Sequence, residues 1–193
     1  DALSQVSRHI FLDEALWSRA YENMALTIGY KQTISQPYIV ARMTEHLISH
    51  TSRRGKVLNQ VLEIGSGCGY QSAVLSHFAN DVFAVERIKP LVLKSRENLR
   101  DLNIRNVEVK HANGFEGWEE TKKFDGIICA AAPRKYPEEL LELLEIGGKL
   151  VIPAGNEGEQ KLYVITKISD TENEEIIHED LSLIHISEPT RRP

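Results

Sequence analysis

Short apolar runs alternate with longer amphipathic segments through residues 57–181 of the chain. The runs, rich in Val, Ile and Leu, fit strands buried on both faces, and the segments with an apolar residue every three or four positions fit helices. This alternation predicts an α/β domain with a doubly wound, mostly parallel sheet. The expected strands are 57–64, 81–85, 107–111, 124–130, 149–153 and 161–166, and the expected helices are 71–78, 90–102 and 137–144.

Residues 1–56 show a different pattern and are expected to form an N-terminal helical segment. Apolar positions recur with helical spacing over 14–21, where Asp13 can cap the helix, and again over 38–50. Residues 27–30 interrupt this period and are expected to form a turn.

The C-terminal end departs from the strand and helix pattern. Residues 170–175 are acidic and are expected to form an exposed turn, and 179–181 could begin a final strand. Residues 182–193 are polar and contain proline, so we expect a non-native tail and exclude it from the fold. The sheet would then lack its closing strand and keep an unpaired edge.

The first strand of the α/β domain ends in a loop with glycine at every second position. It contains Glu63, Gly65, Ser66, Gly67 and Gly69, and a helical pattern follows directly. Glycine lets the backbone approach a ligand closely, and the helix that follows directs its N–H groups to the same place. These five residues are therefore expected to bind a ligand that carries carboxylate, ribose or phosphate oxygens.

Two further strand ends carry candidate binding residues. Glu86 ends the second strand about 20 residues after the loop, where such folds place an acid that accepts hydrogen bonds from ribose hydroxyls. Asn113 and Gly114 follow the third strand; Asn113 could bind an adenine edge, or alternatively form an Asx turn with Gly114. Carboxyl ends of parallel strands meet at one edge of the sheet, so these residues should converge.

Composition excludes several function classes. The 193 residues carry a net charge of −5, which argues against a nucleic-acid partner. No apolar run approaches the ~18 residues of a membrane span and no signal-peptide pattern opens the chain, so no membrane partner is expected. Cys68 and Cys129 provide no disulfide framework and are expected to be buried residues of a cytoplasmic protein.

Local patterns for metal binding and nucleophilic catalysis are weak. His46 and His50 share one helix face, but no third ligand accompanies them, so no metal is expected. The chain contains no G-x-S-x-G motif. Ser35 lies just before the second helix, and local sequence alone makes it the helix N-cap.

Several blocks of the chain resemble protein-L-isoaspartate O-methyltransferases, a family of class I S-adenosylmethionine-dependent methyltransferases. The most specific block is Gln32-Thr33-Ile34-Ser35-Gln36-Pro37, because methyltransferases in general share the glycine loop but not this segment. The resemblance extends over nearly the whole chain, from Ser7 to Leu181. The matching blocks lie within 20–37, 61–70, 124–133 and 147–155.

This resemblance implies a Rossmann-like methyltransferase fold and S-adenosyl-L-methionine as the cofactor. It gives Ser35 the active-site role, so that the N-terminal segment contributes to the active site. The glycine loop, Glu86, Asn113 and Gly114 would bind the cofactor. The residues implied to lie beside the substrate are Thr33, Ile34, Ala130, Ala131 and Pro133.

The implied reaction is methyl transfer to the α-carboxylate of L-isoaspartyl residues in damaged proteins and peptides, by a monomer that initiates repair. Two alternatives stay open: a class I methyltransferase that acts on another substrate, and a truncated domain that binds cofactor without turnover. The chain departs from the family at three points. The family's earlier N-terminal helix is expected to be missing, an acid is common in the family where Asn113 stands, and the family's closing strand is expected to be replaced by the tail.

Overall fold

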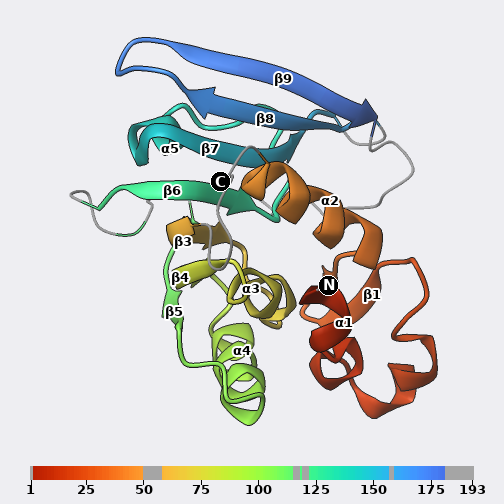
Figure 1. Ribbon diagram of the computed structural model, residues 1–193. Coiled ribbons are helices and arrows are strands. Elements are labelled where there is room, and N and C mark those ends of the chain that lie inside the picture. Colours follow the sequence, from red (N-terminus) through yellow and green to blue (C-terminus); the bar gives the residue numbers. More distant parts are fainter. Residues whose placement is uncertain (1, 50–57, 115–117, 119–121, 157–158, 181–193) are drawn as a thin grey trace.

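A seven-stranded sheet forms the centre of the molecule (Figure 1). The computed structural model describes residues 2–49, 58–114, 118, 122–156 and 159–180. The strand order is β5-β4-β3-β6-β7-β8-β9. The first five strands in this order run parallel, β8 pairs antiparallel with β7, and β9 pairs antiparallel with β8. The strands are β3 Leu58–Ile64, β4 Ala79–Glu86, β5 Val107–His111, β6 Phe124–Cys129, β7 Leu144–Ala154, β8 Lys161–Lys167 and β9 Asn173–Asp180. The expected mostly parallel α/β sheet is confirmed.

Both faces of the sheet are buried, as its apolar strands require. Val61 and Ile128 pack against helix α2, whereas their neighbours Leu62 and Ile127 point to the opposite face and pack with Leu140 of α5. Within the described residues no helix is long and apolar enough to cross a membrane. The helices are α1 Ala2–Gln5, α2 Pro37–Ile48, α3 Tyr70–Leu75, α4 Lys89–Asp101 and α5 Glu139–Glu142, with 3₁₀ helices η1 Arg8–Phe11 and η2 Glu14–Arg19.

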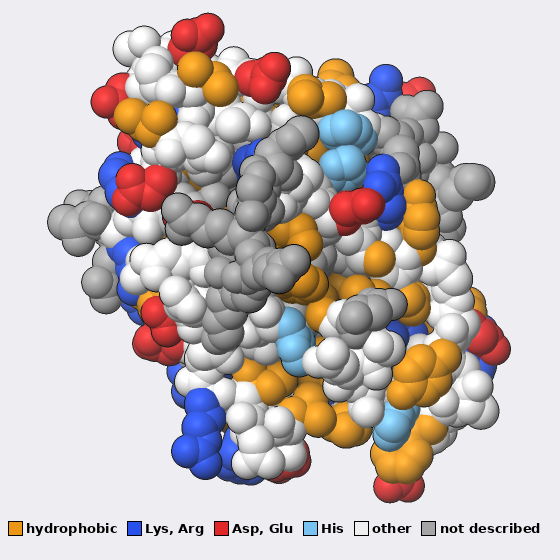
Figure 2. Space-filling view, viewed as in Figure 1, with side chains coloured by type: hydrophobic (Ala, Val, Ile, Leu, Met, Phe, Trp, Pro, Cys, Tyr) orange, Lys and Arg blue, Asp and Glu red, His pale blue; other side chains and the backbone are white. Residues whose placement is uncertain are grey.

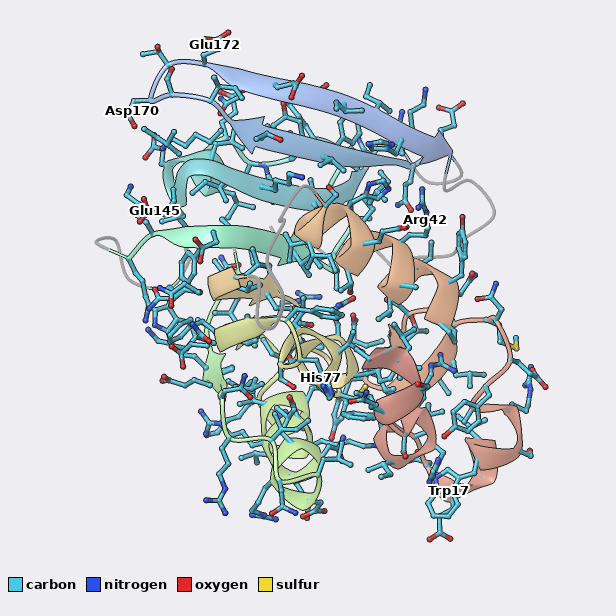
Figure 3. The ribbon with its side chains drawn as sticks, in the orientation of Figure 1. Trp17, Arg42, His77, Glu145, Asp170 and Glu172 are labelled. Atoms are coloured by element: carbon cyan, nitrogen blue, oxygen red, sulfur yellow. The ribbon has the colours of Figure 1, made fainter. Side chains whose placement is uncertain are left out.

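The C-terminal edge differs from its expected form. Asp170 and Glu172 lie at the turn between β8 and β9 (Figure 3), but Asn173 to Glu175 already belong to β9 rather than to an exposed turn. β9 pairs along β8, so the expected unpaired edge of β8 is wrong. Charged residues are common on edge strands, where one side faces water, and this hid the strand in the sequence. Residues 182–193 lie outside the described part of the chain.

The helix expected over 14–21 is the shorter 3₁₀ helix η2. Asp13 occupies its N-cap position, but the side chain makes no capping hydrogen bond. Its carboxylate instead accepts a hydrogen bond from Lys94 Nζ of α4 at 3.1 Å. The N-terminal segment is thereby tied to the α/β domain at this point.

The helix expected over 137–144 is also too long. The structure has only the short α5, and β7 begins at Leu144 rather than at 149. Gly147, with φ +84°, gives the early part of β7 an irregular course, and the pairing with β6 shifts register there. Because of this departure from regular strand geometry, the sequence pattern does not indicate that β7 begins at Leu144.

A β-hairpin replaces the turn expected at 27–30. Strand β1 Leu26–Gly29 pairs antiparallel with β2 Gln32–Ile34. Tyr30 and Lys31 form the two-residue loop, with φ of +55° and +57°. Positive φ at both loop positions is the type I′ geometry, which usually carries Asn-Gly, so Tyr30-Lys31 does not indicate a hairpin at the level of sequence.

Replacing the loop by Asn-Gly, through Tyr30→Asn with Lys31→Gly, should stabilise the protein. Bulky residues are strained in the left-handed region, and the change should raise the free energy of unfolding by about 1 kcal/mol. Thermal melts would measure this as a rise in Tm of roughly 2–4 °C. The matched variant with alanine at both positions still has side chains where the backbone is left-handed, so its Tm should not rise. A Tm that falls with Asn-Gly would contradict the assigned turn.

Candidate active site

The glycine loop crosses from the end of β3 to the start of α3. The backbone N–H groups of Gly65 and Ser66 both donate to the carbonyl of Val85 in β4, at 2.9 and 3.2 Å. Gly69 has φ +91°, and a Cβ there would lie 2.6 Å from Ser95 Oγ of α4. The loop is therefore fixed by the neighbouring strand, and the positive φ of Gly69 together with the approach of Ser95 favours glycine at that position.

Glu86 holds the same loop from the end of β4. Its Oε2 accepts a hydrogen bond from the Gly67 N–H, and its Oε1 accepts one from the Ile88 N–H, both at 2.9 Å. A carboxylate oxygen has two lone pairs, so each oxygen can accept one more hydrogen bond. Glu86 is thus both a structural support of the loop and a remaining acceptor beside it.

Glu63 is a fully buried carboxyl at the end of β3. Ser72 Oγ of α3 donates to its Oε2, while Oε1 has no hydrogen-bond partner among the described residues. The Ser66 hydroxyl is also buried, and it too has no hydrogen-bond partner among the described residues. Burial raises the pKa of Glu63 to about 8; the Ser72 hydrogen bond opposes this shift, and Glu86 adds to it. Two buried polar atoms that lack partners in one loop indicate a place where a polar ligand binds.

The loops after β5 and β6 lie against the same strand end. A Cβ on Gly114 would lie 2.2 Å from Ile64 Cγ2, so only glycine fits there without a shift. The Ala130 N–H donates to the Ile64 carbonyl at 2.9 Å, and a Cβ on Gly65 would lie 3.8 Å from the Ala131 nitrogen. The structure therefore brings the predicted residues of β3, β5 and β6 together.

Two other predicted residues lie beside that group. Asn113 is exposed next to Gly114. The Pro133 carbonyl accepts a hydrogen bond from the Gly155 N–H at 3.1 Å, which ties the loop after β6 to the end of β7.

The N-terminal hairpin lies directly against the glycine loop. A Cβ on Gly67 would lie 3.2 Å from Ile28 Cδ1 of β1. On α2, Thr44 Oγ1 accepts a hydrogen bond from Gln71 Nε2 of α3 at 3.0 Å. Since β2 and α2 flank Ser35, these contacts bring the Ser35 segment to the edge of the sheet where the glycine loop lies.

Ser35 itself is half-buried between β2 and α2. The N-cap of α2 is Gln36, so the expectation from local sequence that Ser35 caps this helix is wrong. Thr33 is exposed, whereas the Ile34 side chain is buried in the core. Any contact of Ile34 with a ligand would therefore use its backbone.

Arg8 is a residue of this region that sequence reasoning missed. Its Nη1 donates to the Ala20 carbonyl, and its Nη2 donates to the carbonyls of Met24 and Ser35 at 3.1 and 3.0 Å. These acceptors are backbone atoms 12, 16 and 27 residues away. No side-chain pattern in the sequence marks such partners.

The sequence model of the protein-L-isoaspartate(D-aspartate) O-methyltransferase family matches residues 1–189. The chain belongs to this family. It is 54% identical over 174 residues to the protein-L-isoaspartate O-methyltransferase of Methylobacillus flagellatus, covering 90% of this chain and 75% of the relative. A second relative, protein-L-isoaspartate O-methyltransferase 1 of Marinobacter nauticus, is 53% identical over 167 residues, covering 86% of this chain and 74% of the relative.

A solved structure shares the fold of this family member. It is the protein-L-isoaspartate O-methyltransferase of Plasmodium falciparum in complex with S-adenosyl-L-homocysteine, with 27% identity and a TM-score of 0.76. The similarity covers 98% of this chain and 91% of that one. The structural similarity to this methyltransferase therefore includes both the N-terminal segment and the sheet of the present chain.

The remaining candidate residues are histidines and cysteines. Within the described residues no cluster of three or more His, Cys, Asp or Glu could hold a metal. His46 stacks on His178 of β9, with ring centroids 4.1 Å apart, and His50 lies outside the described residues. Cys68 and Cys129 are buried free thiols, as expected.

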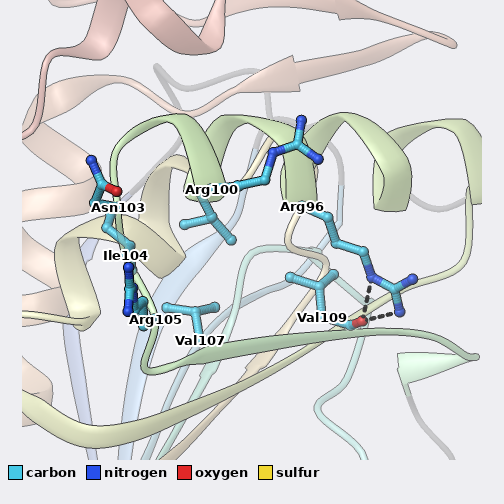
Figure 4. A pocket seen from close by; sticks show the side chains of 8 residues that line it. Arg96, Arg100, Asn103, Ile104, Arg105, Val107 and Val109 are labelled. Carbon is cyan, nitrogen blue, oxygen red and sulfur yellow. Dashed lines mark hydrogen bonds between the residues drawn. The ribbon is translucent and has the colours of Figure 1, made fainter.

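A hollow of about 220 Å³ lies between α4 and the amino end of β5 (Figure 4). Arg96, which lines it, donates to the Val109 carbonyl from Nε at 3.0 Å and also from Nη2. The hollow is at the opposite end of β5 from Asn113 and Gly114, so it is separate from the candidate active site.

The raised pKa of Glu63 predicts a pH-dependent stability of the ligand-free protein. Between the ordinary pKa of 4.5 and about 8, the folded state keeps a proton that the unfolded chain releases. Stability should therefore fall as pH rises through this range, by on the order of a few kcal/mol in total. Glu63→Gln is neutral at every pH and should remove this decline.

Denaturant unfolding from pH 5 to pH 9 would measure the effect. We expect Glu63→Gln to match the unsubstituted chain near pH 5 and to exceed its stability at pH 9. Glu108→Gln, at an exposed position on β5, serves as the control and should keep the full decline. Parallel curves for Glu63→Gln and the unsubstituted chain would show that Glu63 is ionised in the folded state.

Proposed function

We propose that this chain is a protein-L-isoaspartate O-methyltransferase, which transfers a methyl group from S-adenosyl-L-methionine to the α-carboxylate of L-isoaspartyl residues. The observation that carries this proposal is the contact between Ile28 and Gly67, which holds the family-specific segment before α2 against the glycine loop. Family membership over residues 1–189 supports the same activity. A general class I methyltransferase would need the glycine loop but not this segment.

The residues at the ends of β3, β4 and β5 fit the cofactor. Glu63 Oε1 is a buried acceptor without a partner among the described residues, which suits an ammonium or hydroxyl donor. Glu86 keeps one acceptor position on each oxygen for ribose hydroxyls. Asn113 and Gly114 would complete the site on the adenine side. When bound, S-adenosyl-L-methionine supplies an electrophilic methyl group on a positively charged sulfur.

The substrate carboxylate needs no general base. A carboxyl group with an ordinary pKa of about 4 is already ionised at neutral pH. The protein therefore has to position the carboxylate in line with the methyl group and remove its water. This requirement matches a site built from a serine, backbone amides and small residues, without an acid–base pair among its described residues.

Ser35 is the residue assigned to that positioning. Its hydroxyl would donate a hydrogen bond to the substrate carboxylate and orient it toward the methyl group. Thr33, exposed beside it, and the backbone of Ile34 would contact the substrate. The loop of Ala130, Ala131 and Pro133 would present backbone groups to the substrate peptide.

The substrates would be damaged proteins and peptides. After methylation the ester cyclises to a succinimide without the enzyme, and hydrolysis returns part of it to normal aspartate. In the view of Figure 2, hydrophobic side chains gather over the N-terminal segment, where Trp17, Tyr21, Tyr30 and Tyr38 are exposed. This surface would suit an extended polypeptide. A monomeric state and a cytoplasmic location remain expectations, and the buried free thiols of Cys68 and Cys129 support the latter.

Methyl transfer to a synthetic peptide tests the proposal most simply. The peptide with an L-isoaspartyl residue should be methylated, and its aspartyl twin should not. Methylation of neither peptide, with S-adenosyl-L-homocysteine still bound in calorimetry, would favour the alternative of a methyltransferase for another substrate or an inactive binding domain. Equal methylation of both peptides would contradict the assigned specificity.

Ser35→Ala should lower turnover of the isoaspartyl peptide by roughly 10- to 1,000-fold, the scale of a lost positioning or electrostatic contact. Because the hydroxyl is not the cap of α2, melting temperature should change little. Ser169→Ala, in the exposed turn before β9, is the matched control and should keep full activity. An unchanged rate for Ser35→Ala would remove the residue from the catalytic machinery.

A further inference from the structure

Arg8 is a buried cation without an acidic partner in the described part of the chain. The residue is 1% exposed, and its guanidinium lies 5.8 Å from the centre of the Tyr70 ring. Among the described residues its hydrogen-bond acceptors are all backbone carbonyls, and Nε has no partner there. Arginine stays protonated in proteins, so the region contains a full positive charge.

Burial of such a charge lowers the stability of the fold, so stability does not explain why an arginine lies here. An apolar side chain of similar size would fill the same space without the desolvation cost of the guanidinium. Burial lowers the pKa of Arg8, and the nearby Tyr70 ring opposes that shift. The function of Arg8 therefore depends on the backbone carbonyls to which its guanidinium donates hydrogen bonds.

The carbonyl of Ser35 lies outside the regular secondary structure. Strand β2 ends at Ile34 and α2 begins at Pro37, so neither the strand ladder nor the helix includes Ser35. The first helical hydrogen bond goes from the Val40 N–H to the Gln36 carbonyl. The Ser35 carbonyl instead accepts from Arg8 Nη2 at 3.0 Å.

The same guanidinium also holds the chain that leads into the hairpin. Nη1 donates to the Ala20 carbonyl after η2, and Nη2 donates to the Met24 carbonyl just before β1. The planar guanidinium of arginine directs several N–H donors in fixed directions, like a fork, and so binds several acceptors at once. The ammonium of lysine is a single compact donor group on a flexible side chain. Three separate backbone positions are thus held in one arrangement by one side chain.

We propose that Arg8 is a positioning residue for methyl transfer: its guanidinium fixes the Ser35 carbonyl and thereby aims the Ser35 hydroxyl at the substrate carboxylate. This inference rests on the proposed function of Ser35. Arg8 acts through Ser35 and touches neither substrate nor cofactor in this account.

Arg8→Lys is the informative variant because it keeps the charge and removes the fork. We expect kcat/KM for the isoaspartyl peptide to fall roughly 10- to 100-fold, as for a misplaced catalytic group. The Kd for S-adenosyl-L-homocysteine, measured by calorimetry, should stay within about twofold, since the glycine loop is held by Glu86 instead. Arg19→Lys, in the same segment but exposed and paired with Glu22, is the control and should leave both quantities unchanged.

A double-mutant cycle separates positioning from general support of the fold. In the Ser35→Ala background, Arg8→Lys should lower kcat/KM by less than about twofold, because the group that it positions is gone. A full additional loss in that background would overturn the proposal. Equal losses of cofactor affinity and kcat/KM in the single variant would also overturn it.

Hydrogen exchange provides a readout that does not depend on methyl transfer. Arg8→Lys should raise amide exchange in residues 32–38 and leave residues 63–75 unchanged. If the unsubstituted chain methylates no isoaspartyl peptide, the proposed function fails, and this measurement still decides whether Arg8 holds the Ser35 segment. Unchanged exchange in 32–38 would contradict the proposal. Should Arg8→Lys not fold, Arg8→Gln, which keeps two amide donors, replaces it; unfolding of both variants would assign Arg8 to the fold alone.

Discussion

The contact between the N-terminal hairpin and the glycine loop determines what the rest of this molecule can do. The sheet alone would present a loop, an acid on β4 and two further strand ends, as many nucleotide-binding α/β folds do. Ile28 of β1 packs where a side chain on Gly67 would otherwise lie. This packing brings a segment from the start of the chain to the carboxyl edge of the sheet and places Ser35 in that region.

Buried ionisable side chains on both sides of this contact serve different purposes. Glu86 uses both carboxylate oxygens to hold backbone N–H groups, so its charge is stabilised by the loop that it orders. Glu63 has one oxygen with no partner in the described residues and a raised pKa, so it gains from a ligand that supplies a donor. Arg8 donates its hydrogen bonds to backbone carbonyls of the N-terminal segment. The glycine loop is thus ordered by the carboxylate of Glu86, and the N-terminal segment is ordered by the guanidinium of Arg8.

Sequence reasoning was successful where side-chain periodicity sets the structure. Strands β3, β4 and β6 are apolar runs buried on both faces, and their ends carry the predicted Glu63, Glu86 and Ala130. It failed where backbone geometry decides: the type I′ loop at Tyr30 and Lys31 lacks the usual Asn-Gly, and charged residues concealed β9. Arg8 was missed because carbonyl acceptors leave no trace in a sequence. The family resemblance identifies the Ser35 segment, where local sequence alone predicts a helix cap.

A crystal structure of the protein with S-adenosyl-L-homocysteine would show whether the glycine loop and Ser35 belong to one site. We expect the ribose within hydrogen-bond distance of Glu86, and the sulfur beside the glycine loop on the side that faces Ser35. Ligand bound at another edge of the sheet would contradict the account, as would a sulfur separated from Ser35 by more than the length of a substrate carboxyl group.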